Sequence, residues 1–282
     1  MEIATKIAPI ALALIMLGLG LGLTLENFIR VLKFPKDFIV GFACQLILLP
    51  IVAFILIKIL NTPAEIALGV MIIAAAPGGV TSNILTKFAY GDVALSVSLT
   101  AIVSLISIFT VPFIVFKSAE IFQISASLKE ISMISISLKM FFVVTLPIII
   151  GMLIRKFATN FIVSKTLIIQ RISIILFAVV FISIWIEEWD NIASYIIRAG
   201  SITLTLNITM MILGYYVANF LASKIEQRKA ISLECGLQNG TLAVFVSTQI
   251  FDEVVYMVPT AAYALIMFIT SIIFVFIIKN KS

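Results

Sequence analysis

The sequence predicts an all-α polytopic membrane protein with nine transmembrane helices. Three observations predict it: 62% of the 282 residues are hydrophobic, only 12% are charged, and nine runs of 15 or more residues carry no charge. A soluble domain of this size needs more polar surface. Because about 20 residues of helix cross a bilayer core of roughly 30 Å, each run is close to the length of one span. The runs also lack the alternation of apolar and polar residues that a membrane β-barrel requires.

The positions of these runs give the expected helices. Charged residues that flank the shorter runs can snorkel toward the interface, which extends those runs to spanning length. We expect spans at 5–25, 38–60, 64–89, 92–117, 138–155, 166–187, 199–222, 228–251 and 254–279. Segment 118–138 is too interrupted to span, and is either an interfacial amphipathic piece or an ordinary long loop.

The distribution of Lys and Arg predicts the orientation of the chain. Twelve of them lie in the loops after helices 1, 3, 5 and 7 and at the C-terminus, whereas six lie at the N-terminus and in the even-numbered loops. Cytoplasmic loops of membrane proteins are enriched in Lys and Arg. We therefore expect a multi-pass protein of the cell membrane (inner or plasma membrane), with the N-terminus outside and the C-terminus in the cytoplasm.

The composition disfavours several classes of function. The chain has no histidine, which removes His general bases, Ser-His and Cys-His nucleophile pairs and His metal ligands. Cys44 and Cys235 lie in different apolar segments, so neither a zinc site nor a disulfide framework is expected. The basic residues behind the net charge of +5 sit mainly between the apolar runs, as in a membrane protein. We expect no enzyme activity, no nucleic-acid partner and no obligatory protein partner. Membrane lipid is an expected partner.

The third predicted span is interrupted near its middle by a Pro-Gly-Gly sequence at 77–79. Proline removes a backbone donor and clashes with the preceding turn, and glycine adds freedom, so the helix is expected to break there. In lipid, the freed backbone groups are tolerated only where they are buried in protein or line a wet cavity. The polar residues Thr81, Ser82 and Asn83 come soon after the break.

The eighth predicted span has the same character and also contains a carboxylate. Glu234 is followed by Gly236, Gln238, Asn239, Gly240 and Thr241. An ionised carboxylate at the bilayer centre costs about 2.5–3.5 kcal/mol on insertion scales, so it persists only with a partner. A bound cation is the natural partner, and the alternative is a protonated Glu234 that hydrogen-bonds to a neighbouring helix.

The two interrupted spans occupy equivalent places in two triplets of helices. Spans 38–60, 64–89 and 92–117 form one triplet, and spans 199–222, 228–251 and 254–279 form the other. Each triplet reads as an intact helix, a broken helix and a helix with an internal proline. Counting from helix 2 to helix 7, the triplets are offset by an odd number of spans, so they are inverted in the membrane. Inverted repeats with paired broken helices are typical of secondary transporters with a site near the midplane.

The polar residues of these segments suit a hard cation, which prefers oxygen ligands. Ser96 and Thr100 are four residues apart and share one helix face. With Ser82, Asn83 and Glu234 they make a five-oxygen cage of one net negative charge. For the two hydroxyls taken alone, hydrogen bonds to carbonyls of their own helix are the competing interpretation.

A second cage is expected beside the first. Gln238 lies one helical turn after Glu234, and Gln45 is a polar residue in an otherwise apolar run. The break near Cys235 and Leu237 frees backbone carbonyls that can complete this cage.

The stretches PGGVTSNILTKFAYGDVALSVSLT and ECGLQNGTLA resemble the signatures of the bile acid:sodium symporter family, in its nine-helix version. The resemblance implies a panel domain (1–37 and 139–197, helices 1, 5 and 6) and a core domain (38–138 and 198–282, helices 2–4 and 7–9). It also implies two crossing broken helices, two Na⁺ sites and alternating access of one domain against the other.

The resemblance also assigns residues to these sites. The first Na⁺ site would be Ser82, Asn83, Ser96, Thr100 and Glu234. The second would be Gln45, Glu234, Cys235, Leu237 and Gln238, with Cys235 and Leu237 acting through their carbonyls. The expected substrate crevice is bordered by Val80, Thr81, Asn239, Gly240 and Thr241. Many members carry a Thr where this chain has Val80, which removes a hydroxyl from the crevice.

The sequence thus predicts a sodium-coupled symporter of an organic anion, either bile-acid-like or a small carboxylate. Two alternatives stay open, which are proton coupling through Glu234 and a passive channel. The neutral oxygen ligands around Glu234 favour sodium, because a proton needs none of them.

Overall fold

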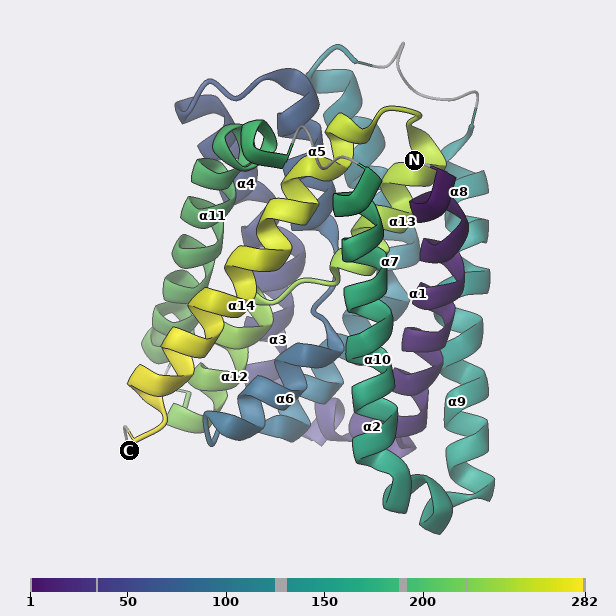
Figure 1. The fold of residues 1–282 in the computed structure, drawn as a ribbon. Coiled ribbons are helices and arrows are strands. Elements are labelled where there is room, and N and C mark those ends of the chain that lie inside the picture. The colour runs from purple at the N-terminus through teal and green to yellow at the C-terminus, as the bar shows by residue number, and fades with distance from the viewer. Residues whose placement is uncertain (1, 34, 125–130, 188–191, 222, 281–282) are drawn as a thin grey trace.

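The computed structural model describes the chain except residues 1, 34, 125–130, 188–191, 222 and 281–282 (Figure 1). The described residues form helices and no strands, and one isolated antiparallel bridge joins Gly78 to Gln238. The all-α prediction is therefore confirmed for this part of the chain.

The helices follow one another with short connections. In chain order they are α1 (Glu2–Gly22), α2 (Leu25–Lys33), α3 (Pro35–Ala43), α4 (Leu49–Ile59), α5 (Ala64–Ala75), α6 (Val80–Phe88), α7 (Val93–Ile121), α8 (Met133–Met140), α9 (Leu146–Phe157), α10 (Thr159–Glu187), α11 (Ile192–Phe220), α12 (Ile225–Gly236), α13 (Gly240–Ile250) and α14 (Val258–Ile278). Two π-helical turns, Cys44–Leu48 and Phe141–Thr145, join α3 to α4 and α8 to α9, and a 3₁₀ turn, Val254–Met257, precedes α14.

Within the described part of the chain, seven helical stretches are long and apolar enough to cross a membrane. They are Thr5–Gly22, Pro35–Ile59, Val93–Ile121, Met133–Phe157, Thr159–Ile186, Ala199–Phe220 and Val254–Ile278. Each matches one predicted span. The other two predicted spans, 64–89 and 228–251, each consist of two shorter helices with non-helical residues between them.

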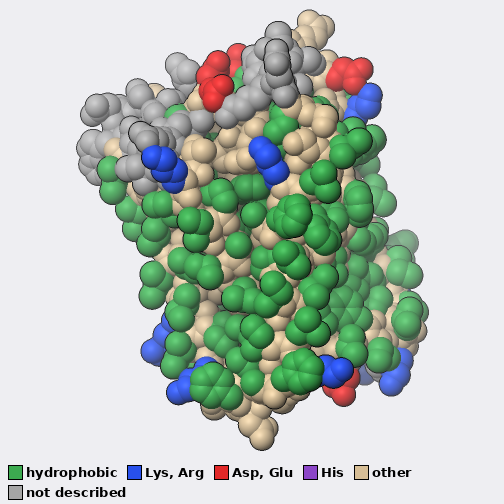
Figure 2. All heavy atoms as spheres, turned by 90° about the vertical axis from the view of Figure 1, so that its right-hand side faces the viewer, with side chains coloured by type: hydrophobic (Ala, Val, Ile, Leu, Met, Phe, Trp, Pro, Cys, Tyr) green, Lys and Arg blue, Asp and Glu red, His purple; other side chains and the backbone are tan. Residues whose placement is uncertain are grey.

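The surface agrees with a membrane environment. Figure 2 shows one face of the molecule, where hydrophobic side chains cover the middle and Lys and Arg side chains lie toward the two ends. Large apolar side chains such as Phe157 and Phe220 are more than four-fifths exposed. In water this surface would be a liability, whereas in a bilayer it contacts lipid.

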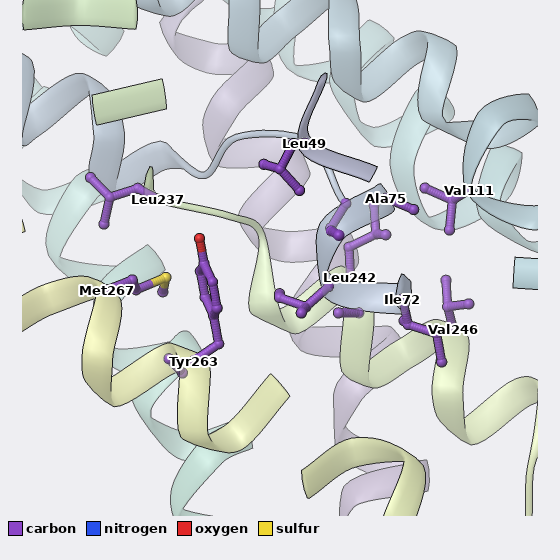
Figure 3. Close-up of a cluster of buried hydrophobic side chains, with 14 of the residues drawn as sticks. Leu49, Ile72, Ala75, Val111, Leu237, Leu242, Val246, Tyr263 and Met267 are labelled. Atoms are coloured by element: carbon purple, nitrogen blue, oxygen red, sulfur yellow. The ribbon is translucent and has the colours of Figure 1, made fainter. Parts of the chain in front are cut away.

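The helices gather around α5, α7 and α13, with α1 as a partner on one side. α1 packs against α9, α10 and α13, while α11 and α14 pack on each other and on α12 and α5 respectively (Figure 1). Figure 3 shows apolar side chains from α5, α7, α13 and α14 meeting near the centre of the bundle. Leu237 lies there on the extended segment between α12 and α13.

The structure extends or divides some predicted elements. α7 continues to Ile121 and α8 begins at Met133, so helices enter both ends of segment 118–138, while 125–130 lies outside the described residues. α2 is a separate helix between the first two predicted spans, where no helix was predicted. The π-helical turns were also not predicted. They depend on local packing and have no hydropathy signal.

Candidate functional site

The two interrupted spans meet at their breaks. α5 ends at Ala75 and α6 begins at Val80, while α12 ends at Gly236 and α13 begins at Gly240. The predicted helix breaks are therefore confirmed. Across the gap the N–H of Gly79 donates to the carbonyl of Leu237 at 3.1 Å, and the N–H of Asn239 donates to the carbonyl of Pro77 at 2.8 Å. Backbone groups that lost their helical partners thus satisfy one another.

Glu234 lies beside this crossing and is fully buried. Its carboxylate Oε1 accepts hydrogen bonds from Ser82 Oγ, from Ser96 Oγ at 2.5 Å and from Thr100 Oγ1 at 3.0 Å. Thr100 Oγ1 is also 3.0 Å from Oε2. All of these donors are neutral. Within the described residues, no Lys or Arg forms an ion pair with Glu234.

Asn83 completes this cluster of side chains, which we call the Glu234 cluster (Ser82, Asn83, Ser96, Thr100 and Glu234). Its Oδ1 accepts from Ser96 Oγ at 2.8 Å and lies 3.5 Å from Thr100 Oγ1. The hydroxyls of Ser96 and Thr100 point at side chains of α6 and α12 and do not bond to carbonyls of α7. The structure therefore brings together all five residues predicted for the first cage.

Gln45 and Gln238 converge on the main chain of Glu234. Gln45 Nε2 donates to the Glu234 carbonyl at 2.9 Å, and Gln238 Nε2 lies 3.3 Å from the same oxygen and donates to the Cys235 carbonyl at 2.9 Å. The side-chain carbonyl oxygens of both glutamines are buried without a hydrogen-bond partner. A buried acceptor without a partner costs about 1–3 kcal/mol, so this pair of oxygens marks a place for a donor or a cation.

The backbone carbonyls predicted for the second cage lie at the same break. The Leu237 carbonyl accepts the N–H of Gly79, and the Cys235 carbonyl accepts Gln238 Nε2. Each carbonyl oxygen has a second lone pair for another partner. Gln45 itself sits in the π-helical turn Cys44–Leu48, a distortion often found at functional sites.

Gly78 allows the two cages to sit against the crossing. A Cβ atom at this position would lie 2.3 Å from Glu234 Oε2 and 2.9 Å from Gln45 Nε2. Any larger residue would displace the Glu234 carboxylate and the Gln45 amide, so this close approach favours glycine.

A narrow cavity of about 30 Å³ lies beside the crossing. Its walls include Val80, Thr81, Asn239 and Thr241, which are four of the five residues predicted for the substrate crevice. The fifth, Gly240, is buried where a Cβ would lie 2.7 Å from the ring of Phe181. The cavity holds about two waters in this conformation.

Two polar atoms in the cavity wall have no partner. Asn239 Oδ1 caps α13 by accepting the N–H of Leu242 at 3.0 Å, which leaves its Nδ2 without a hydrogen bond. The buried Thr241 Oγ1 also has none. Both groups can donate a hydrogen bond, and among the described residues neither has an acceptor.

The opposite wall of the cavity was not identified from the sequence. Ile15 of α1 and Ser173, Ile174 and Phe177 of α10 form it. Three of these are apolar residues within long apolar helices, so they have the same pattern as lipid-facing positions.

A third set of polar residues forms hydrogen bonds with the backbone at the end of α12. The carbonyl of Gly236 accepts from Asn207 Nδ2 at 2.7 Å and from Tyr263 Oη at 3.0 Å. Asn207 Oδ1 in turn accepts from Thr270 Oγ1 at 2.6 Å. Asn207 thus makes hydrogen bonds to both α12 and α14. Figure 3 shows the Tyr263 hydroxyl directed toward the extended segment of Leu237.

The fold and site define an integral membrane protein with an interrupted-helix site. The sequence profile of the "Sodium Bile acid symporter family" matches residues 9–195. The chain belongs to that family.

Several curated proteins are similar to it. The "Probable sodium/metabolite cotransporter BASS1, chloroplastic" of Arabidopsis thaliana is 28% identical over 242 residues, 85% of this chain and 58% of the relative. The "Uncharacterized sodium-dependent transporter YocS" of Bacillus subtilis (strain 168) is 28% identical over 256 residues, 90% of this chain and 77% of the relative. The "Ileal sodium/bile acid cotransporter" of Cricetulus griseus is 29% identical over 243 residues, 85% and 68% respectively. The aligned part of this chain spans less than three-fifths of the length of the Arabidopsis relative.

Proposed function

We propose that the protein is a sodium-coupled symporter of an organic anion. The observation that carries the proposal is the Glu234 cluster, a fully buried carboxylate whose hydrogen-bond partners are all neutral oxygen and amide groups. A buried charge needs compensation, and neutral groups supply only part of it. A monovalent cation supplies the rest.

The chemistry of the donors suits Na⁺. Each hydroxyl of Ser82, Ser96 and Thr100 has one proton and two lone pairs, so it can donate to Glu234 or turn a lone pair to a cation. Asn83 Oδ1 offers a further oxygen at the same place. Binding of Na⁺ by these oxygens neutralises Glu234 and ties α6, α7 and α12 together.

A second Na⁺ site is proposed at Gln45, Glu234, Cys235, Leu237 and Gln238. The unpartnered side-chain oxygens of Gln45 and Gln238 support it, because the amide groups of both residues bond to the main chain of α12 while their carbonyl oxygens stay available. The two sites share Glu234, so occupation of one changes the charge at the other.

The substrate is proposed to bind where α6 and α13 begin. Both helices start at the crossing, and their N-termini carry partial positive charge that attracts an anion. Asn239 Nδ2 and Thr241 Oγ1 add hydrogen-bond donors. No charged side chain lines the cavity, and its far wall is mostly apolar. This lining favours an anion with an apolar body, such as a bile-acid-like molecule or a small carboxylate.

Transport would follow from relative movement of two groups of helices. The proposed panel (1–37 and 139–197) contributes Ile15 and Phe177 to the cavity, and the proposed core (38–138 and 198–282) contributes the crossing and both cation sites. The two broken spans support nine transmembrane elements arranged as an inverted repeat. A cavity of about 30 Å³ is too small for an organic anion, so the panel must move away from the core to admit one.

The orientation proposed from the Lys and Arg distribution gives the direction of transport. It places the N-terminus outside a cell membrane and the C-terminus in the cytoplasm, so an inward sodium gradient would drive uptake.

The deciding experiment measures sodium-specific stabilisation of the purified protein. Thermal unfolding is compared in NaCl and in KCl at equal ionic strength for wild type, Glu234→Gln and the control Glu226→Gln, which changes an exposed carboxylate in the first turn of α12. We expect NaCl to raise the melting temperature of wild type and of the control, and to leave Glu234→Gln unchanged. A sodium response that survives in Glu234→Gln would refute the site. A response to pH in place of sodium would favour proton coupling.

A further inference from the structure

Another cavity, of about 330 Å³, is lined by residues of α2, α3, α7 and α12. α2 and the start of α12 lie at the same end of the bundle (Figure 1). None of its lining residues belongs to the Glu234 cluster or the substrate cavity. Its walls come from α2, the start of α3, the start of α7 and the turn before α12.

The two carboxylates in this cavity are already held by donors from the protein. Asp92 Oδ2 accepts from Arg30 Nη2 at 2.6 Å and from Gln227 Nε2 at 2.8 Å. Asp37 accepts a hydrogen bond from the hydroxyl of Ser223. These bonds fix the acids as part of the wall.

Two ammonium groups face the cavity without such a partner. Lys36 begins the first turn of α3, and Lys224 is the N-cap residue of α12, where no side chain caps the helix. Within the described residues neither forms an ion pair, and both are exposed. Each therefore adds a cation beside a helix N-terminus, which is itself favourable for an anion.

The cavity also carries an unused acceptor. Gln227 Oε1 is buried without a hydrogen-bond partner, while the amide nitrogen of the same residue is bonded to Asp92. Three cationic and two anionic side chains line the cavity, which leaves one formal positive charge. The charge of the lining thus suits a singly charged anion.

The exposed apolar face of α2 indicates which kind of molecule carries this anion. Leu25, Ile29 and Leu32 lie one helical turn apart on α2 and are 66%, 47% and 80% exposed, whereas Phe28 and Val31 pack onto the core. A helix with an exposed apolar stripe at the end of a membrane bundle lies in the interface, against lipid. Such a placement of α2 would put the neighbouring cavity near the lipid headgroups.

We propose that this cavity binds the headgroup of an anionic phospholipid of the phosphatidylglycerol type. The phosphodiester sits between Lys36, Lys224 and the exposed part of Arg30. Basic pockets of this kind between membrane helices are a known mode of lipid recognition. The bound lipid would join α2 and α3 to α12, and this inference does not depend on what the protein transports.

The test uses the full-length protein, stripped of lipid in a neutral detergent. Phosphatidylglycerol, phosphatidylcholine and soluble glycerol phosphate are added in turn, and thermal unfolding and native mass spectrometry are recorded. We expect phosphatidylglycerol to raise the melting temperature by about 3 °C or more above phosphatidylcholine, and to stay bound in the gas phase. Equal stabilisation by glycerol phosphate would overturn the assignment to a lipid.

Variants locate the site. Lys36→Gln/Lys224→Gln should lose at least half of the phosphatidylglycerol effect, and Lys36→Arg/Lys224→Arg should keep it. The matched control is Lys156→Gln/Lys165→Gln, which removes two exposed lysines of α9 and α10 that do not line the cavity. If the control pair and the cavity pair lose the effect equally, the lipid response is a general charge effect and the proposal is wrong.

Discussion

The side-chain amide of Gln45 donates to both the main-chain carbonyl of Glu234, at 2.9 Å, and the carboxylate of the same residue, at 3.1 Å. One residue of the π-helical turn between α3 and α4 thus bonds to both the backbone and the carboxylate of Glu234. Its own carbonyl oxygen has no hydrogen-bond partner. Gln45 therefore links the second proposed cage to the carboxylate that the two cages share.

Gln45→Leu is expected to remove the second sodium site and leave the first. The substitution keeps the volume but removes the oxygen ligand and the donor. In sodium titrations of thermal stability, the Hill coefficient should fall from about two toward one, because it cannot exceed the number of coupled sites. The control Gln249→Ala changes a glutamine near the end of α13 and should not alter the curve. A Hill coefficient that is the same in Gln45→Leu and wild type would contradict the second site.

Gly78→Ala is expected to abolish the sodium response. The added Cβ would lie 2.3 Å from Glu234 Oε2, so the carboxylate must move away from its donors. Overpacking of this kind costs about 1–3 kcal/mol in addition to the lost ion binding. Gly22→Ala is the control, because a Cβ there has no neighbour within 4 Å. The prediction fails if both variants bind sodium as wild type does.

Thr241→Val is expected to weaken substrate binding without lowering stability. Its hydroxyl is buried and unpartnered, so a methyl group in its place costs the substrate-free protein nothing. The stabilisation given by organic carboxylates and sulfonates, screened in the presence of sodium, should be lost. Thr248→Val on the same helix removes a hydroxyl that donates to the Phe245 carbonyl at 2.8 Å, so it should cost about 1 kcal/mol and leave anion binding intact. The opposite pattern in the two variants would place the anion elsewhere.

Asp92→Asn and Asp92→Ala should separate two roles of one residue. Asp92 Oδ1 caps α7 by accepting the N–H of Leu95 at 3.0 Å, and Oδ2 pairs with the partly exposed Arg30. Asn also caps helices, so Asp92→Asn keeps the cap but loses the ion pair with Arg30 and the hydrogen bond from Gln227 Nε2, at a cost of about 1–2 kcal/mol. Asp92→Ala loses the cap as well and should cost about 1 kcal/mol more. Equal melting temperatures for the two variants would show that the cap contributes nothing.

The breaks in the fold were predictable because they rest on local chemistry. Pro-Gly-Gly at 77–79 ends a helix by backbone sterics in any context, and Asp92 has the side chain of an N-cap. Glu234 stood out because a carboxylate is rare within an apolar run. Ser96 and Thr100 could be predicted as members of the site because their spacing of four residues puts both hydroxyls on one helix face.

Other features have no local signal. The turn that places Gln45 is a π-helix, which reflects how α3 and α4 pack and not which residues they contain. Phe177 and Ile15 line the proposed substrate cavity. The segments around them have the same apolar pattern as helices that face lipid. The helix α2 is short and mixed in polarity, so the hydropathy of its residues does not predict a helix there. These positions are set by contacts between distant segments, which periodicity does not encode.

The backbone bonds from Gly79 to Leu237 and from Asn239 to Pro77 join segments nearly 160 residues apart in the chain. A ribosome that adds about 5–20 residues per second needs roughly 8 to 30 seconds to make the stretch between them. For that time the first break has been inserted without its partner, and its exposed N–H and C=O groups must be met by water or by the insertion machinery. Completion of the site is therefore a late event in biogenesis, and truncation before α13 leaves the earlier half with an unsatisfied break.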